Sequence, residues 1–493
     1  MSVPIAVGAS AMPTFSRLFR LAKTQAELDF VDVDLERDSP LFVDPFALGQ
    51  RLDNWSHEAA LTVATFFQEV VTRIKNGEDD SAVELLMHLH EPNETRLGYS
   101  KNMPKGAGLG TEQAGELFDA LKTSSAVRTG FITSLEEAEL MIEGIGRDKI
   151  SDLTTNIIRA HLIEYTESQC ALYGIPTQEV ALPPCFDVES MSWEERFAKG
   201  PVYKNKPILL VPKVIVRYAP AYQNQKYYQH NVLNFLKARE LANPQSRLVR
   251  VLRLKKGRIV RKLTKKTLKE HFPNTKNYLF EFSRKHPEVL RGYRSQLETI
   301  ERSGSAAELG QEDESLLAVA LAAALKSIKP GDAEATQYHR LMIGIVEFLF
   351  YPSLLHPKKE KEIHEGRKRI DIVMENGATG GPFFTLSNAQ RIPCLYVPFE
   401  CKNYGREVGN PELDQLAGRF SLNRGKAGFL CCRNFANRAT FIKRCRDTIK
   451  DDRGLIIPLD DKTVVSLLKL IGKGERTGFD KALSDLIAEV LLS

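Results

Sequence analysis

Tyr396-Val-Pro-Phe-Glu-Cys-Lys402 is an apolar run that ends with a carboxylate and an amine two residues apart. Together with the two residues before it, this run predicts a buried strand over residues 394–402. Because side chains alternate across a strand, Glu400 and Lys402 share one face, opposite to that of Cys401. The sequence therefore predicts a polar spot on an otherwise buried strand.

A second apolar strand is expected upstream, over residues 369–374, and it carries one carboxylate at Asp371. If the two strands pair, Asp371 and Glu400 converge. Convergent carboxylates bind a hard divalent cation such as Mg²⁺. Such a metal polarises a phosphoryl oxygen and activates water, and a neighbouring lysine stabilises the developing charge. These are the groups that hydrolysis of a phosphodiester bond requires.

The surrounding pattern predicts an α/β fold with a mixed central sheet in the C-terminal part of the chain. Apolar residues at helical spacing alternate there with short apolar runs. The expected order is helix 316–327, helix 333–349, strand 369–374, strand 394–402, helix 411–420 and strand 427–432.

This ordered set resembles the PD-(D/E)xK nuclease superfamily, to which many restriction and repair nucleases belong, over about residues 335–435. The resemblance implies a restriction-endonuclease-like mixed sheet flanked by helices. It also implies that Asp371 and Glu400 hold a metal ion and that Lys402 assists the attacking water. Mg²⁺ is the expected cofactor, with Mn²⁺ as a substitute.

Three further residues join the predicted site by the same resemblance. Glu347, on the preceding helix, occupies the place of a glutamate that many members carry there, and Gln415, on the following helix, resembles a glutamine that some members place near the site. Cys401 completes the predicted metal set. Ile370 stands where the motif has proline, and a glycine-rich insertion at 377–381 lengthens the connection between the two strands.

Basic residues flank the predicted site and supply the phosphate contacts that nucleic-acid binding requires. They precede the aspartate and follow the strand that ends in Lys402. The residues predicted to contact nucleic acid there are Arg367, Lys368, Arg369, Arg419, Arg424 and Lys426.

A second basic stretch, residues 247–269, holds 11 Lys or Arg and no Asp or Glu. Such a run is a candidate for a second nucleic-acid contact. A solvated two-stranded face around Gly257 explains the charge alternation nearly as well, so both interpretations stay open. The predicted contacts in this stretch are Lys255, Lys256, Arg258, Arg261 and Lys262.

The length of 493 residues exceeds what one hydrophobic core supports, so several domains are expected. Residues 1–198 are predicted to form an α+β module with a sensing or regulatory role. Residues 199–300 are predicted to form a basic middle segment, which includes a buried strand at 208–218. A linker is expected at 301–315, and the nuclease-like domain at 316–493.

Cysteine usage and hydropathy indicate the compartment. Seven cysteines without a C-x-x-C pair predict neither a disulfide framework nor a structural zinc site. The apolar run Leu316–Leu325 is shorter than the roughly 20 residues that span a bilayer. A reduced, cytoplasmic location without a membrane partner is therefore expected.

The function expected from these features is Mg²⁺-dependent cleavage of nucleic acid. DNA is favoured as the substrate, although phosphate chemistry alone does not separate it from RNA. By analogy with large modules fused to such nucleases, bacterial restriction or anti-phage defence is expected, with an activating ligand or partner at the N-terminal region. A homo-oligomer is expected, because cutting both strands of a duplex usually needs two sites. The alternatives are a catalytically silent nucleic-acid-binding or assembly module, and an RNA-cleaving toxin.

Overall fold

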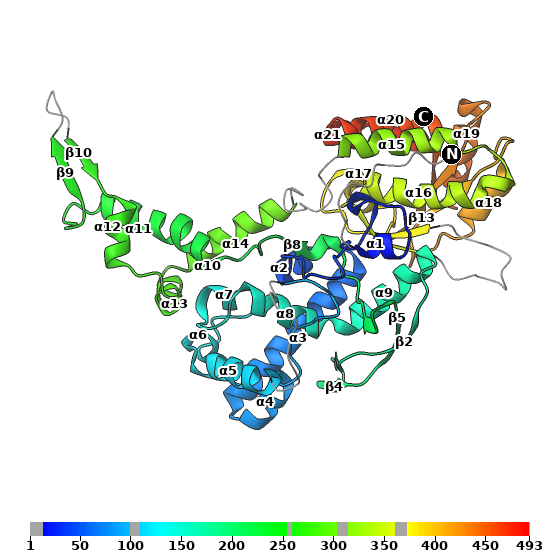
Figure 1. Cartoon of the computed structure of the whole chain (residues 1–493). Coiled ribbons are helices and arrows are strands. Elements are labelled where there is room, and N and C mark those ends of the chain that lie inside the picture. The colour runs from blue at the N-terminus through cyan, green and yellow to red at the C-terminus, as the bar shows by residue number, and fades with distance from the viewer. Residues whose placement is uncertain (1–12, 99–108, 254–258, 303–313, 360–371, 493) are drawn as a thin grey trace.

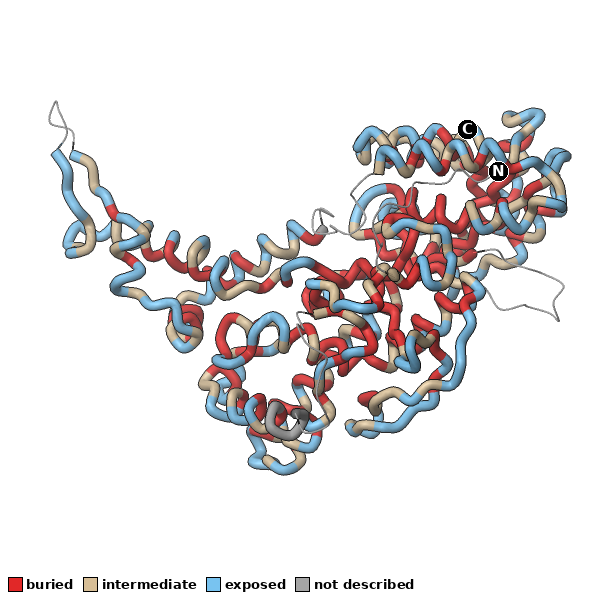
Figure 2. Tube along the Cα trace, viewed as in Figure 1, coloured by how far each residue is buried: buried red, intermediate tan, exposed pale blue. Residues whose placement is uncertain are grey.

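The computed structural model describes residues 13–98, 109–253, 259–302, 314–359 and 372–492, which form two hydrophobic cores (Figure 1). The buried side chains of the first core come from Phe15 to Tyr293, with Leu355 added. Those of the second core come from Ala318 to Val490, with Ala26 and Leu172 added. Each core thus takes side chains from the chain segment that builds the other. Figure 2 shows these buried positions concentrated where the two cores meet.

The first core is built mainly from helices, with small two-stranded sheets at its edges. Its helices are α1 (Phe15–Leu18), α2 (Pro45–Gly49), α3 (Asn54–Asn76), α4 (Asp79–Leu86), α5 (Leu109–Thr123), α6 (Ser125–Arg128), α7 (Ala138–Met141), α8 (Arg147–Ile157) and α9 (Arg159–Tyr173), with 3₁₀ turns η1 (Gln25–Glu27) and η2 (Lys213–Ile215). Its strand pairs are β1 (Phe42–Val43) with β8 (Val216–Arg217), β2 (Gln178–Ala181) with β5 (Phe197–Gly200), β3 (Cys185–Asp187) with β4 (Ser192–Glu194), and β6 (Val202–Tyr203) with β7 (Lys206–Pro207).

The first core continues through the position at which the sequence suggests a boundary between residues 198 and 199. Every residue from Ile208 to Val216 is buried. The predicted strand over 208–218 is wrong for most of its length, because only Val216–Arg217 pairs as a strand. Pro212, which has no N–H to donate, lies in the middle of the run and is followed by the 3₁₀ turn η2.

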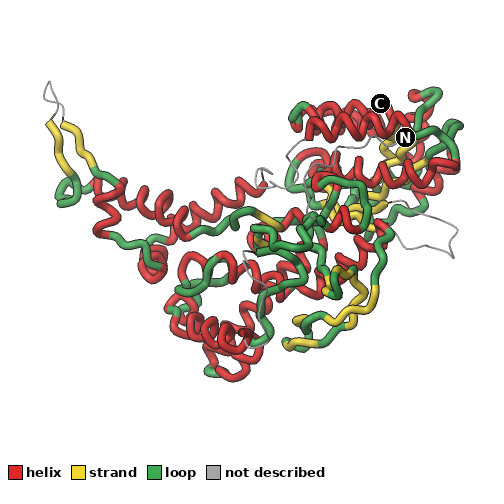
Figure 3. The backbone as a smooth tube through the Cα atoms, viewed as in Figure 1, coloured by secondary structure: helices red, strands yellow, loops and turns green. Residues whose placement is uncertain are grey.

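Residues 224–302, described except for 254–258, extend from the body as an arm (Figure 1). Figure 3 shows that the arm is helical near the body and ends in two strands. Its elements are α10 (Asn224–Lys226), the π-helical η3 (Tyr227–Val232), α11 (Leu233–Ala242), β9 (Arg250–Arg253), β10 (Ile259–Lys262), α12 (Lys265–His271), α13 (Lys276–Lys285) and α14 (Pro287–Arg302).

The second core surrounds a five-stranded mixed sheet with strand order β11-β12-β13-β14-β15. The β11–β12 and β12–β13 pairs are antiparallel, whereas β13–β14 and β14–β15 are parallel. The strands are β11 (Leu354–Lys358), β12 (Ile372–Asn376), β13 (Tyr396–Lys402), β14 (Ala427–Cys432) and β15 (Leu455–Asp460). The helices are α15 (Glu314–Ser327), α16 (Ala335–Phe350), α17 (Gly381–Asn388), α18 (Asn410–Ala417), α19 (Arg438–Lys450), α20 (Asp461–Gly472) and α21 (Arg476–Leu491), with the 3₁₀ turn η5 (Asp332–Glu334).

The predicted α/β class with a mixed central sheet is confirmed. Each helix and strand expected in this part has a counterpart within two or three residues, although residues 369–371 lie outside the described chain. The strand β11, which adds a partner to β12, is not expected from the sequence. Among the described helices none is both long and apolar enough to cross a bilayer.

An aromatic cluster fixes one face of the sheet. Phe399 of β13 and Phe429 of β14 stack with ring centroids 4.9 Å apart. Phe350 of α16 lies 5.5 Å from Phe399 and 5.2 Å from Phe429, so this helix covers that face. Aromatic pairs of this kind contribute about 0.5–1.5 kcal/mol each beyond the area they bury. The residues of β13 that alternate with Phe399 therefore point to the opposite face.

The opposite face of the sheet is shared between the first core and α18. At β11 and β12, Leu355 belongs to the first core, and the Trp55 backbone N–H donates a hydrogen bond of 3.2 Å to Glu375. At β14 and β15, α18 packs on the strands. Between these two covers lies β13, with Glu400 on this face.

Candidate active site

Glu400 is the centre of the candidate site. Its side chain is buried at 0% residue exposure on β13, opposite Leu430 of β14. The Lys402 amine lies 2.5 Å from Glu400 Oε1, and the Arg419 guanidinium donates to Oε2. A buried carboxylate requires such partners, since an unpaired charge in the interior is strongly unfavourable. The predicted polar spot is therefore present as an acid held by two cations.

Lys402 is oriented by the helix that follows its strand. Its Nζ donates a hydrogen bond of 3.2 Å to Gln415 Oε1 of α18 and lies 5.9 Å from the centroid of the Tyr404 ring. The start of α18 is fixed because the Gly409 N–H donates 2.7 Å to Glu412 Oε2. The structure thus brings Glu400, Lys402 and Gln415 together, as the sequence predicts.

Arg419 has a different place from the one that the sequence suggests. Its position among other basic residues predicts a nucleic-acid contact, but its side chain is only 5% exposed and pairs with Glu400. It follows α18 by two residues, and its backbone N–H donates 3.1 Å to Leu416 O. No local pattern distinguishes an arginine that turns back onto a strand from one that faces solvent.

The end of β13 is held by two residues that sequence reasoning did not single out. Asn403 is 4% exposed, and its Nδ2 donates to the carbonyl oxygens of Lys329 at 3.0 Å and Gly331 at 2.7 Å. Arg433, just after β14, donates 3.0 Å to Asn403 Oδ1. These bonds fix the backbone next to Lys402. In the sequence, the feature that points to Asn403 is its place in the polar run Lys402-Asn403-Tyr404, which follows the acid Glu400.

Glu347 lies apart from this group. Tyr173 of α9 donates a hydrogen bond of 2.6 Å to Glu347 Oε1, and within the described ranges no hydrogen bond or ion pair joins Glu347 to Glu400 or Lys402. Burial raises the pKa of Glu347 to about 8, against the lowering effect of Lys23. The predicted helix glutamate therefore faces the first core.

Apart from Arg261 and Lys262 of β10, the remaining predicted residues divide into three groups. The Cys401 thiol lies on the face opposite to Glu400, where it packs against the second core. Lys426 forms an ion pair of 2.7 Å with Asp452, and Arg424 is exposed beside the strand. Outside the described residues lie Asp371, Arg367, Lys368, Arg369, Lys255, Lys256 and Arg258.

The chemistry of the side chains around Glu400 decides whether the site suits a divalent cation. No group of three or more His, Cys, Asp or Glu side chains suited to a metal occurs in the described part of the chain. Glu400 supplies one carboxylate. Asp371, the second carboxylate that the sequence predicts, lies outside the described residues. A hard cation that keeps several of its waters is chemically compatible with this single described carboxylate.

A buried charge cluster joins the two cores, and we call Asp29, Asp53, Lys213, Glu347 and His356 the interface cluster. All five side chains are buried. Asp29, Asp53 and Lys213 belong to the segment that builds the first core, whereas Glu347 of α16 and His356 of β11 belong to the segment that builds the second.

His356 is the central member of the interface cluster. It lies in a bulge of β11 at φ 51°, a left-handed conformation in which histidine is enriched. Its Nε2 is 3.0 Å from Asp53 Oδ1, and its Nδ1 is 3.3 Å from Asp29 Oδ2. Burial lowers the pKa of His356, but the two carboxylates outweigh it and raise the pKa to about 10. An imidazolium therefore bridges two carboxylates of the first core at neutral pH.

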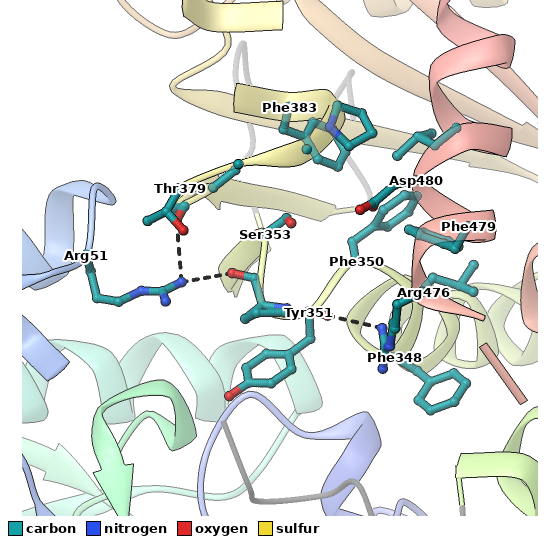
Figure 4. A pocket seen from close by; sticks show the side chains of 18 of the residues that line it. Arg51, Phe348, Phe350, Tyr351, Ser353, Thr379, Phe383, Arg476, Phe479 and Asp480 are labelled. Carbon is teal, nitrogen blue, oxygen red and sulfur yellow. Dashed lines mark hydrogen bonds between the residues drawn. The ribbon is translucent and has the colours of Figure 1, made fainter. Parts of the chain in front are cut away.

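A cavity of about 340 Å³ lies beside the interface cluster (Figure 4). Figure 4 shows Arg51 on one side and Arg476 with Asp480 on the other. The Arg51 guanidinium donates to the carbonyl oxygens of Pro352 at 2.9 Å and Gly377 at 3.4 Å. Neither Glu400 nor Lys402 lines this cavity, so it is separate from the candidate active site.

The Glu347→Gln variant tests the pKa of the buried carboxyl. A carboxyl whose folded-state pKa is raised stabilises the fold below its unfolded pKa of 4.5, and this contribution is lost as pH rises toward about 8. We expect the free energy of unfolding of the wild type to fall between pH 5 and pH 7, by up to roughly 1 kcal/mol per pH unit more than that of Glu347→Gln. Urea unfolding at both pH values measures the difference.

The glutamine keeps an acceptor for Tyr173, and every other titrating group is common to the two proteins. Parallel pH profiles would show that Glu347 is ionised in the folded state and would contradict the expectation.

Comparison with known proteins matches only the first core. A family model described as a domain of unknown function (DUF8370) matches residues 20–223. The matched segment ends just before the arm and includes neither β13 nor any other strand of the five-stranded sheet. No curated protein and no solved structure matches the chain.

Proposed function

We propose that this protein is a Mg²⁺-dependent nuclease whose active site is built on β13. The observation that carries the proposal is the buried Glu400 carboxylate, held by Lys402 and Arg419 beside Gln415, at the end of a strand in a mixed sheet. A buried acid and amine that share one face of a strand and are oriented by a neighbouring helix form a prearranged polar site. Prearranged charge of this kind is the main source of enzymatic rate acceleration.

The order of elements supports a restriction-endonuclease-like fold for the second core. Helix α16 is followed by β11, by β12 directly after Asp371, by β13 with the acid and the lysine, by α18 with Gln415, and by β14. This is the order that the resemblance implies, with β11 as an added partner of β12. We assign the nuclease reaction to this core on that basis.

Each residue has a distinct part in the proposed reaction. Glu400, with Asp371, would hold the metal, and when bound Mg²⁺ supplies polarisation of the phosphoryl oxygen and a water of lowered pKa. The Lys402 ammonium orients the attacking water and stabilises the negative charge that develops on the phosphoryl oxygens. Gln415 positions Lys402, and Arg419 fixes the orientation of the Glu400 carboxylate.

The test is cleavage by the purified full chain. Supercoiled plasmid, linear duplex DNA, single-stranded DNA and RNA are each incubated with Mg²⁺, with Mn²⁺ or with EDTA. Cleavage that requires the metal is expected, with DNA as the preferred substrate. Cleavage of RNA alone would move the proposal to a ribonuclease, and cleavage that persists in EDTA would contradict it.

A catalytically silent nucleic-acid-binding module is the second candidate. It is favoured by the observation that both oxygens of Glu400 are engaged by side-chain cations, as in a structural ion-pair network. Such a module binds nucleic acid but cuts none of the four substrates in any metal. The same incubations therefore separate the two candidates when binding is measured beside cleavage.

A further inference from the structure

The β9–β10 hairpin at the end of the arm is exposed on both faces. Its register pairs Arg253 with Ile259 and Val251 with Arg261, so these four side chains share one face. Val251 is 61% exposed and Ile259 is 60% exposed. At the base of the hairpin the Arg261 guanidinium donates a hydrogen bond to Asn243 O.

Isolated two-stranded hairpins are marginally stable in water, and exposed sheet edges invite association. A solvated face alone explains the charges of this hairpin, but not apolar side chains that are more than half exposed on the same face. The exposure of these apolar residues favours a binding role for this basic stretch over a purely solvated face.

The charge around the hairpin has a single sign and is not neutralised. Six basic side chains on the hairpin and the adjoining segments are exposed, and none makes a hydrogen bond or an ion pair with another described residue. They are Arg247, Arg250, Arg253, Lys262, Lys266 and Lys269. No acidic residue occurs in the sequence between 247 and 269. A partner that covers this surface must carry regularly spaced negative charge, which is the property of a nucleic-acid backbone.

The shape of the hairpin favours double-stranded DNA over double-stranded RNA as the partner. The major groove of B-form DNA, about 12 Å wide, admits a two-stranded β-ribbon, whereas the major groove of A-form RNA is deep and too narrow for side chains to read. Apolar side chains on such a ribbon contact base edges and thymine methyl groups while flanking cations contact phosphates.

We infer that the β9–β10 hairpin binds duplex DNA by entering its major groove. This inference deepens the proposed function and rests on it, because it names duplex DNA as the substrate that the arm captures. Figure 1 places the hairpin at one extreme of the molecule and β13 near the other. The protein then holds DNA at a position remote from the one at which it cuts.

Binding of the full chain to a fluorescent 30-base-pair duplex, measured in EDTA over a range of salt concentrations, tests this inference without cleavage. In the Arg250→Ala/Arg253→Ala/Lys262→Ala variant, the slope of log affinity against log salt concentration is expected to fall by about 3. Affinity at 0.15 M salt is expected to fall about 10²-fold. The control variant Lys469→Ala/Lys473→Ala/Lys481→Ala removes three exposed lysines, one from α20, one directly after α20 and one from α21, and should leave both quantities unchanged.

A second variant separates groove contacts from phosphate contacts. Val251→Ser/Ile259→Ser should weaken binding to the DNA duplex about tenfold or more, while leaving the salt dependence as in the wild type. The wild type should also bind the DNA duplex at least tenfold more tightly than an RNA duplex of the same sequence. Equal affinity for both duplexes, or wild-type binding by the triple arm variant, would overturn the inference.

The outcomes for the arm and for the nuclease are distinguishable. Arm-dependent duplex binding without cleavage in any metal would retain the inference and reject the proposed function. Metal-dependent cleavage that the triple arm variant performs with wild-type affinity would retain the function and reject the inference.

Discussion

Lys402→Ala is expected to lower the rate of metal-dependent DNA cleavage by about 10³-fold, within the range that a positioned proton-transfer group contributes. The Lys402 amine lies 2.5 Å from Glu400 and 3.2 Å from Gln415, so it stands in a fixed place beside the proposed metal ligand. Its removal leaves no ammonium to orient water or to stabilise charge on the phosphoryl oxygens. Single-turnover cleavage of a linear duplex measures the rate directly.

Two comparisons distinguish loss of the lysine's chemical role from loss of the folded structure. Lys443→Ala removes an exposed lysine from α19 and should cut as the wild type does. Lys402→Ala itself should bind duplex DNA normally in EDTA and keep the far-ultraviolet circular dichroism of the wild type. Undiminished cleavage by Lys402→Ala would remove the lysine from the mechanism, and loss of binding together with cleavage would assign it a structural role.

His356→Ala is expected to lower the free energy of unfolding by about 3–5 kcal/mol, the range found when one partner of a buried ion pair is removed. The imidazolium lies between Asp29 and Asp53, and its loss removes the cation that the two buried carboxylates share, leaving Asp53 with Arg51 at 4.0 Å. Urea unfolding followed by tryptophan fluorescence is suited to this measurement, because the Trp55 ring lies 5.1 Å from the His356 ring.

The control is His57→Ala, which removes an exposed histidine near the start of α3 and should change stability by less than about 0.5 kcal/mol. Adding Asp29→Asn and Asp53→Asn to His356→Ala should restore part of the loss, since the uncompensated charges disappear. A change below 1 kcal/mol in His356→Ala would mean that the cluster does not hold the cores together.

The same histidine sets a pH limit for the fold. Its folded-state pKa is raised from 6.5 to about 10, so its contribution is complete below pH 6.5 and is lost as pH rises toward 10. The Asp53 carboxylate has the opposite dependence. Burial raises its pKa, but His356 lowers it below its usual value, so its contribution is lost as pH falls below 3.8.

The parts of the site that the sequence predicts are those decided by short-range geometry. Glu400 and Lys402 share a face because strand alternation requires it, and Gln415 faces them because a short crossover helix between parallel strands packs back on the sheet. The α/β class follows from the same alternation of apolar runs and helical patterns.

Contacts between distant segments are not accessible to such reasoning. Glu347 occupies the expected helix, but which side of that helix meets the sheet is decided by the first core, through Tyr173. His356 has partners 303 and 327 residues away, and its orientation depends on a bulge that no motif in β11 indicates. Apolar periodicity fails for residues 208–218 because a run that is buried on all sides resembles a central strand.

The interface cluster also bears on how this protein can evolve. A domain that contacts its neighbour through a hydrophobic surface can be recombined with another domain during evolution. The surface that becomes exposed can then acquire polar residues by later mutation. Here the His356 imidazolium of one half lies between the Asp29 and Asp53 carboxylates of the other, so either half alone would lose a charged partner of its buried groups. The two halves are therefore expected to stay together in one chain during evolution. A change on one side of the cluster is tolerated only after a matching change on the other.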